Sequence, residues 1–237
     1  MTSNLRRIAA IAGSVLALGA VATALAGQTD KGRFHLGIAA KQPDAATALR
    51  FRILYGNPED RATKPTPVTG AVFYLPPGLR IDTAAVPQCD AEEAEIRALG
   101  RGACPAGSQV GEGRLIARTG FPGADRVRTD VVVFNGAGEL IEIVFVEGTN
   151  TVAGFDRITI DGNVLTAHPP ETPGGPPDGR TAVQKIFLEL PERIGSGGVP
   201  YVTTPPVCRR GSWRSSAAYE FADGSETTVP SRTRCGG

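Results

Sequence analysis

The chain has 237 residues, of which 41% are hydrophobic, and its 25 Lys and Arg nearly balance its 24 Asp and Glu. A formal net charge of +1 gives no electrostatic basis for binding nucleic acid or an acidic membrane surface, so we expect neither as a partner. The length is sufficient for one sizeable hydrophobic core.

Residues 1–26 have the pattern of a secretory signal peptide, whose apolar part is expected to be helical. Arg6 and Arg7 precede an uncharged stretch, residues 8–26, that ends on the small-x-small triplet Ala24-Leu25-Ala26. We therefore expect cleavage after Ala26, secretion, and only transient contact with the membrane. Two alternatives stay open: an uncleaved anchor formed by residues 8–26, and twin-arginine rather than general secretory export.

Residues 27–237 are predicted to form a single β-rich domain. Period-two alternation of apolar and polar residues marks 49–55, 186–190 and 213–221 as half-buried strands, while 131–134 and 141–146 are apolar on nearly both faces, as in central strands. Turn-forming residues are frequent, with 30 Gly and 19 Pro. Short strands separated by such turns favour an all-β fold, an antiparallel β-sandwich of immunoglobulin-like or jelly-roll-like type.

One short helix interrupts this pattern. Asp90 and Glu93 have the spacing of a capping box, which predicts a helix over residues 91–99 that ends at Gly100 or Gly102. Farther along the chain, residues 168–179 (HPPETPGGPPDG) contain too many prolines for regular structure and are expected to form an exposed loop.

The cysteines predict disulfide bonds, as is usual in an exported protein. Four cysteines allow three pairings, but two local pairs, 15 and 27 residues apart, favour the pairings Cys89–Cys104 and Cys208–Cys235. A zinc site is the alternative. It is disfavoured because the chain has no CxxC or HxxxH pair, and we expect no metal or other cofactor.

No set of residues meets the requirements of a known catalytic site. The two histidines, His35 and His168, are the candidate bases of a serine hydrolase, but no GxSxG motif positions a serine. Among the acids near the strand at 141–146, Glu142 has the most apolar neighbours. The favoured interpretation is that Glu142 faces solvent from an antiparallel sheet, and we assign no catalytic residue.

Glu139 and Glu147 lie beside the same strand and could complete a carboxylate pair for glycoside hydrolysis. The remaining candidates have structural explanations. Asp-Gly pairs at 161, 178 and 223 are typical of turns rather than of a calcium site. Trp213 alternates in phase with Tyr219, so it is expected in the core rather than on a sugar-binding surface.

Several segments resemble a recurrent pattern of exported actinobacterial proteins: LPPGL at 75–79, CPAGSQVG at 104–111, TPPVC at 204–208, and ADGS at 222–225 before Cys235. The chain is similar in these motifs to an uncharacterised family of secreted, disulfide-containing, β-sandwich-like proteins. The resemblance implies export, β-architecture and local cysteine pairing. It implies no catalytic residue and no ligand.

Two functional hypotheses remain. The first is a non-enzymatic binding or scaffold domain, outside the cell or in the cell envelope, with an unknown extracellular or cell-wall ligand. The alternative is a secreted hydrolase that acts on glycans through carboxylates near Glu142. Carboxyl groups that converge in a cleft around Glu142 would favour the enzyme, whereas a flat, solvated sheet face would favour the binding domain.

Overall fold

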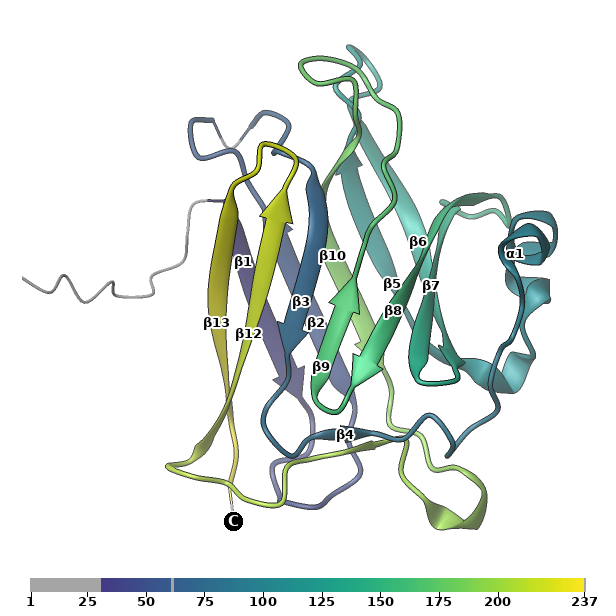
Figure 1. Cartoon of the computed structure of the whole chain (residues 1–237), viewed down its shortest axis with the longest axis vertical. Helices are drawn as coiled ribbons and strands as arrows, with labels where there is room; N and C mark the ends of the chain where they lie inside the picture. Colours follow the sequence, from purple (N-terminus) through teal and green to yellow (C-terminus); the bar gives the residue numbers. More distant parts are fainter. Residues whose placement is uncertain (1–30, 61, 237) are drawn as a thin grey trace, which may run out of the picture.

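In the computed structural model, residues 31–60 and 62–236 are described. The signal peptide predicted at residues 1–26 and the start of the predicted domain lie outside them, so both remain predictions. Eleven strands form one sheet, and two short strands form a second. Figure 1 shows how the strands of the large sheet are arranged. The strands of the large sheet are β1 (Gly32–Ile38), β2 (Leu49–Tyr55), β3 (Val68–Tyr74), β5 (Gln109–Arg118), β6 (Arg126–Gly136), β7 (Glu139–Val146), β8 (Val152–Asp161), β9 (Val164–Ala167), β10 (Ala182–Leu190), β12 (Ser212–Phe221) and β13 (Glu226–Arg234). The small sheet pairs β4 (Arg80–Ile81) with β11 (Val202–Thr203).

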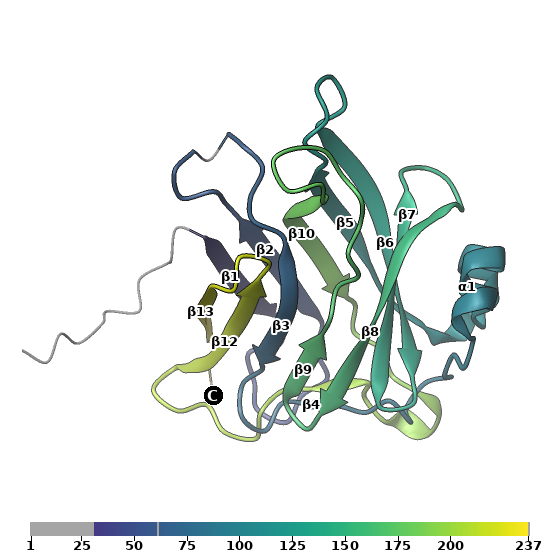
Figure 2. The ribbon, with the colours of Figure 1, turned by 45° about the horizontal axis from the view of Figure 1, so that its top comes forward.

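The large sheet is antiparallel throughout and nearly closes on itself. Its strand order is β1-β2-β10-β5-β6-β7-β8-β9-β3-β12-β13, and its two edge strands, β1 and β13, lie against each other (Figures 1 and 2). Side-chain hydroxyls join these edges: the Leu36 N–H donates to Ser231 Oγ at 3.1 Å, and Thr233 Oγ1 donates to the Leu36 carbonyl. The predicted all-β antiparallel class is thus confirmed, but the strands do not divide clearly into the two layers of a sandwich.

The inner face of the sheet carries the main core. The alternating residues of 49–55 and 213–221 point inward as predicted, and Trp213 is only 4% exposed, which confirms its expected place in the core. Aromatic rings fill one side of this interior, where Tyr55 and Tyr219 meet edge to face with ring centroids 5.1 Å apart. Such contacts add to the free energy gained from apolar burial.

A second core explains why β6 and β7 are apolar on both faces. Val132 and Phe134 of β6, with Ile143 and Phe145 of β7, point outward and are buried under the segment that carries the helix. This helix, α1 (Glu93–Leu99), contributes the fully buried Ile96. It lies on the outside of the sheet beside β7 in Figures 1 and 2.

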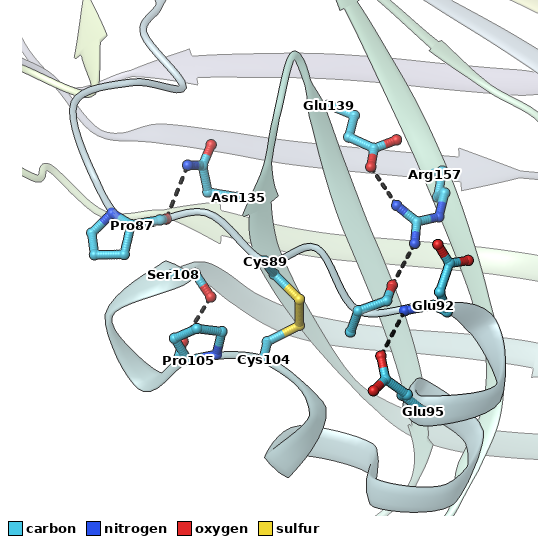
Figure 3. Close-up of a disulfide and its surroundings, with 11 residues drawn as sticks. Pro87, Cys89, Glu92, Glu95, Cys104, Pro105, Ser108, Asn135, Glu139 and Arg157 are labelled. Carbon is cyan, nitrogen blue, oxygen red and sulfur yellow. Dashed lines mark hydrogen bonds and ion pairs between the residues drawn. A yellow bond between two sulfur atoms is a disulfide. The ribbon is translucent and has the colours of Figure 1, made fainter.

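The predicted helix cap was wrong by two residues. Glu92 is the N-cap, and its N–H donates to Glu95 Oε2 at 3.0 Å, so the capping box is Glu92–Glu95. Residues before it cannot enter the helix because Cys89 N–H donates to the Asn135 carbonyl at 2.7 Å and Arg157 holds the Ala91 carbonyl (Figure 3). The predicted end at Gly100 is confirmed; two 3-10 turns, η1 (Gly100–Ala103) and η2 (Ala106–Ser108), follow it.

Both predicted disulfide pairings are confirmed. Cys89–Cys104 brackets the helix with Cα atoms 5.1 Å apart (Figure 3). Cys208–Cys235, with Cα atoms 5.9 Å apart, joins the open end of the β12–β13 hairpin, whose tight end is the predicted turn at Asp223-Gly224. Both bonds suit an oxidising environment. Within residues 31–60 and 62–236, we find no helix with the length and apolar character needed to cross a membrane.

Candidate functional site

The inside of the sheet contains a cavity of about 320 Å³. Inward side chains of β2, β3 and β5 to β10 line it, and most of them are apolar, among them Phe51, Phe73, Leu115, Val144, Ile158 and Ile186. Leu140, Leu165 and Leu190 are buried at one end. Since most ligand sites are concave and mainly apolar with a few polar groups, this cavity is the first candidate for a binding site.

The cavity opens at the end of the sheet where two long turns meet. Its lining there includes the exposed residues Val127, Pro170 and Thr172. The turn at 119–125 and the proline-rich loop project together from this end (Figure 2), and the Gly175 N–H donates to the Thr119 carbonyl at 2.6 Å. The loop predicted at 168–179 is therefore present, as a rim of the cavity.

Lys64 fixes this rim in place. Its ammonium donates to the carbonyls of Gly175 at 3.0 Å and Arg180 at 2.6 Å and forms an ion pair with Asp178. The side chain of Lys64 is only 5% exposed. A buried cation with three oxygen partners is well satisfied, so Lys64 positions the loop and is not available to a ligand.

Glu142 points into the cavity, and the expectation that it faces solvent was wrong. It shares a face of β7 with Leu140 and Val144, which also line the cavity, whereas Ile143 and Phe145 lie on the opposite face. That opposite face is covered by the helix segment and accepts only apolar residues. The period-two geometry of the strand then sends Glu142 inward.

Asp156 of β8 is the cross-strand partner of Glu142, and both side chains line the cavity. Burial first, and the nearby charge of Asp156 second, raise the pKa of Glu142 to about 7. Glu142 retains some accessible surface, but that surface faces the cavity rather than bulk solvent. Burial also raises the pKa of Asp156, against the opposing effect of backbone N–H groups of Arg157 and His168.

No described basic side chain lines the cavity beside this pair, although the charge of His168 at the rim opposes the rise in the pKa of Asp156. Among the described residues that line the cavity there is no Lys, Arg or His, and no hydrogen bond or ion pair joins the Glu142 carboxyl to any of them. Tyr55 lies near enough for the charge of Glu142 to contribute to the raised pKa of its phenol, although burial is the main cause. The cavity can therefore supply one or two carboxyl oxygens to a partner that brings its own proton or positive charge.

In comparisons with known proteins, no family model, no curated protein and no solved structure matches this chain. Its function is therefore inferred from the chemistry of the cavity and the surface.

The other residues singled out from the sequence lie elsewhere. His35 is exposed on the outer face of β1, and Glu147 is exposed in the turn after β7. Glu139 forms an ion pair with Arg157 outside the cavity (Figure 3). His168 is exposed at the rim, where its backbone N–H bonds to Asp156 and its charge also acts to lower the pKa of that carboxyl. In the part of the chain that the structure describes, no three His, Cys, Asp or Glu residues could hold a metal ion together.

Asp156 was missed by the sequence analysis. The available signal was its alternation with two apolar residues, Ile158 and Ile160, which places it on the same face of β8. A charged residue in phase with an apolar row is expected to point inward wherever that row faces a core.

Proposed function

We propose that this protein is an extracellular binding protein that holds a small, mainly apolar amine inside its nearly closed sheet. One observation carries the proposal: the Glu142 and Asp156 carboxyls enter an apolar cavity whose described lining includes no Lys, Arg or His. A carboxylate in such surroundings is costly unless a bound partner neutralises it. An ammonium group does so and donates hydrogen bonds to both carboxyls.

The remainder of the ligand is expected to be apolar. Phe51, Phe73 and Ile158 line the same cavity with surface that offers no hydrogen bonds, so hydrocarbon or aromatic groups gain most from entering. A volume of about 320 Å³ corresponds to a small molecule rather than a polymer. Neutral alcohols and carboxylic acids of the same size would bind less well, because neither neutralises a carboxylate.

The location outside the cell is also part of the proposal. It is supported by the signal-peptide pattern of residues 1–26 and by the two disulfides. We further propose that the chain belongs to the family of secreted actinobacterial proteins that its cysteine-flanking motifs resemble. Protein recovered from culture medium should then begin at or near Gly27; protein that retains Met1 in the membrane fraction would contradict cleavage.

A secreted hydrolase is the second candidate, favoured by the same carboxyl pair. At neutral pH, a Glu142 with a pKa of about 7 could act as a general acid while Asp156 acts as a base. The apolar lining argues against glycans as substrates, since sugar hydroxyls need many hydrogen-bonding groups. Hydrolysis of a glycan panel by the wild-type protein, lost in Glu142→Gln, would favour this candidate over the binding protein.

Calorimetric titration with octylamine, 1-octanol and octanoate tests the proposal. We expect saturable binding of octylamine, weaker binding of octanol and none of octanoate. Loss of a charge-assisted hydrogen bond in Glu142→Gln should weaken the affinity for octylamine by about tenfold or more and leave the affinity for octanol nearly unchanged. Glu147→Gln, an exposed acid after the same strand, is the matched control. Equal affinity for the three compounds would contradict amine selectivity.

A further inference from the structure

A row of exposed cationic side chains crosses the outer wall of the sheet, on the side away from the cavity. His35 of β1 lies opposite Arg52 of β2 in the strand register. Arg52 in turn lies opposite Phe187 of β10, and Phe187 lies opposite Arg114 of β5. All four side chains are exposed, and Phe187 is 40% exposed despite its apolar ring. Adjacent strands lie about 4.8 Å apart, so Arg52 and Arg114 stand roughly 10 Å from each other with Phe187 between them.

The row continues across the seam where the sheet closes. Arg214 of β12 and Arg232 of β13 are register partners and are both exposed. Leu36 donates to Ser231 and accepts from Thr233, the two residues that flank Arg232, and these hydrogen bonds set this part of β13 beside His35. Four arginines from four strands therefore share one band of the outer surface.

Of the 18 described arginines, seven form an ion pair and eleven, including these four, form none within the described residues. Arg52, Arg114, Arg214 and Arg232 form no ion pair with any carboxylate of the described residues. Their neighbours do: Arg50 pairs with Glu189 at 3.1 Å, and other exposed arginines are paired in the same way. Acidic side chains do lie beside the row, since Asp130 is the register partner of Arg114 and Glu112 lines the same groove, but neither forms an ion pair with an arginine of the row. These guanidinium groups therefore stay available to a partner of opposite charge.

The surface between these arginines is shaped for an extended chain. The outer face of β2, β10, β5 and β6 is hollowed into a groove that contains Arg52, Arg114 and Phe187, whereas Arg214 and Arg232 lie outside it. Its other charged side chains are Arg50, Arg101, Glu112, Asp130 and Glu189. A groove suits a linear polymer better than a flat bilayer, and a single exposed ring is too little apolar surface to insert into lipid. The net charge of the chain does not reveal this band, because acidic residues offset it, among them Glu92, Glu93 and Glu95 of the helix segment.

We propose that this arginine row binds an acidic polysaccharide in an extended conformation. Guanidinium groups bind carboxylates with two parallel hydrogen bonds and remain charged at every physiological pH. The exposed face of Phe187 can pack against the apolar face of one sugar ring while Arg52 and Arg114 hold the acidic groups on either side. The site is separate from the cavity and does not depend on the amine ligand.

Titration of the mature protein with polygalacturonate tests the inference, with uncharged pullulan as the comparison polymer. We expect binding of polygalacturonate that weakens as salt is raised, and no binding of pullulan. The double variant Arg52→Gln/Arg114→Gln should lose about tenfold or more in affinity, because it removes the charge-assisted hydrogen bonds of both guanidinium groups. Phe187→Ser should weaken binding without changing its salt dependence.

Control variants distinguish the effect of the arginine row from the effect of a lower total positive charge. Arg80→Gln/Arg209→Gln removes two exposed positive charges outside the row and should leave the affinity unchanged. Unaltered circular dichroism and unaltered octylamine binding would show that Arg52→Gln/Arg114→Gln is folded. Equal losses of affinity in the two double variants would overturn the proposal, and so would no binding of polygalacturonate at low salt. Tighter binding of single-stranded DNA or anionic vesicles than of polygalacturonate would overturn it as well.

Discussion

Glu142 and Asp156 face each other across neighbouring strands, with both carboxyl groups directed into the apolar interior of the sheet. Like charges directly opposite in an antiparallel pair destabilise the sheet. The protein tolerates the pair because the raised pKa of Glu142, about 7, lets it hold a proton at neutral pH. The arrangement therefore links stability, pH and ligand binding at one place.

The first prediction concerns stability against pH. In the folded protein the pKa of Glu142 is about 7, above its usual 4.5, so its stabilising contribution is complete below about pH 4.5 and is lost as pH rises through 7. The loss amounts to about 3 kcal/mol if no water enters with the charge. Glu142→Gln should be more stable than wild type at about pH 8 and similar at about pH 4, measured by urea unfolding.

Because other carboxyls also titrate, the informative quantity is the difference in the free energy of unfolding between wild type and Glu142→Gln at each pH. Asp125 and Asp178, whose pKa values are lowered by ion pairs, change stability in the opposite direction and cancel in that difference. Glu147→Gln serves again as control. A difference between wild type and Glu142→Gln that stays constant between about pH 4 and pH 8 would show that the carboxyl is not buried.

The second prediction concerns the seam between β1 and β13. Ser231→Ala and Thr233→Val each leave a buried polar group of Leu36 without a partner, at a cost of about 1–3 kcal/mol. Thermal and urea unfolding would measure the loss. Thr228→Val, on the exposed face of the same strand, should change stability by about 0.5 kcal/mol or less. Wild-type stability in both seam variants would mean that these hydroxyls do not hold the edges together.

The third prediction concerns the Cys208–Cys235 bond, which closes a 27-residue loop at the open end of the β12–β13 hairpin. Cys208→Ser/Cys235→Ser should lower the free energy of unfolding by about 3.5 kcal/mol on the chain-entropy estimate. Hydrogen exchange should speed up most at Ser212 and Trp213, beside the lost bond, and least near Gly224. Uniform acceleration along both strands would argue against local fraying.

Cys89→Ser/Cys104→Ser is the natural comparison. Its 15-residue loop predicts a loss of about 3 kcal/mol, but the exposed amides should be those of the helix segment and of Asn135, whose carbonyl accepts from Cys89. If hydrogen exchange speeds up at the same amides in both double variants, the two disulfides would stabilise the fold as a whole rather than the segments beside them.

The sequence was most informative where the physics is local. Alternation along 49–55 and 213–221 identified the inward residues, and the turn at Asp223-Gly224 fixed the register that brings Cys208 to Cys235. A strand that is apolar on both faces gives no such indication. For β7, only the helix segment packed on its outer face decides that Glu142 points inward, and that contact joins distant parts of the chain.

Closure of the sheet and formation of the carboxyl pair depend on contacts between residues that are farther apart in the sequence. Leu36 and Ser231 are 195 residues apart in the sequence and meet only when every intervening strand has paired. Asp156 becomes the neighbour of Glu142 through the register of β7 and β8, which a bulge shifts near Phe145. The arginine row has the same origin, since its members come from separate strands and no pattern along the chain connects them.

Titration of the Glu142 carboxyl by ¹³C NMR, in the presence and absence of octylamine, tests the central claim most directly. The free protein should give an apparent pKa of about 7, assigned by its loss in Glu142→Gln. Saturating octylamine should lower this pKa, because the bound ammonium favours the charged carboxylate. An ordinary pKa near 4.3 that octylamine does not change would contradict both the buried carboxyl and the proposed amine site.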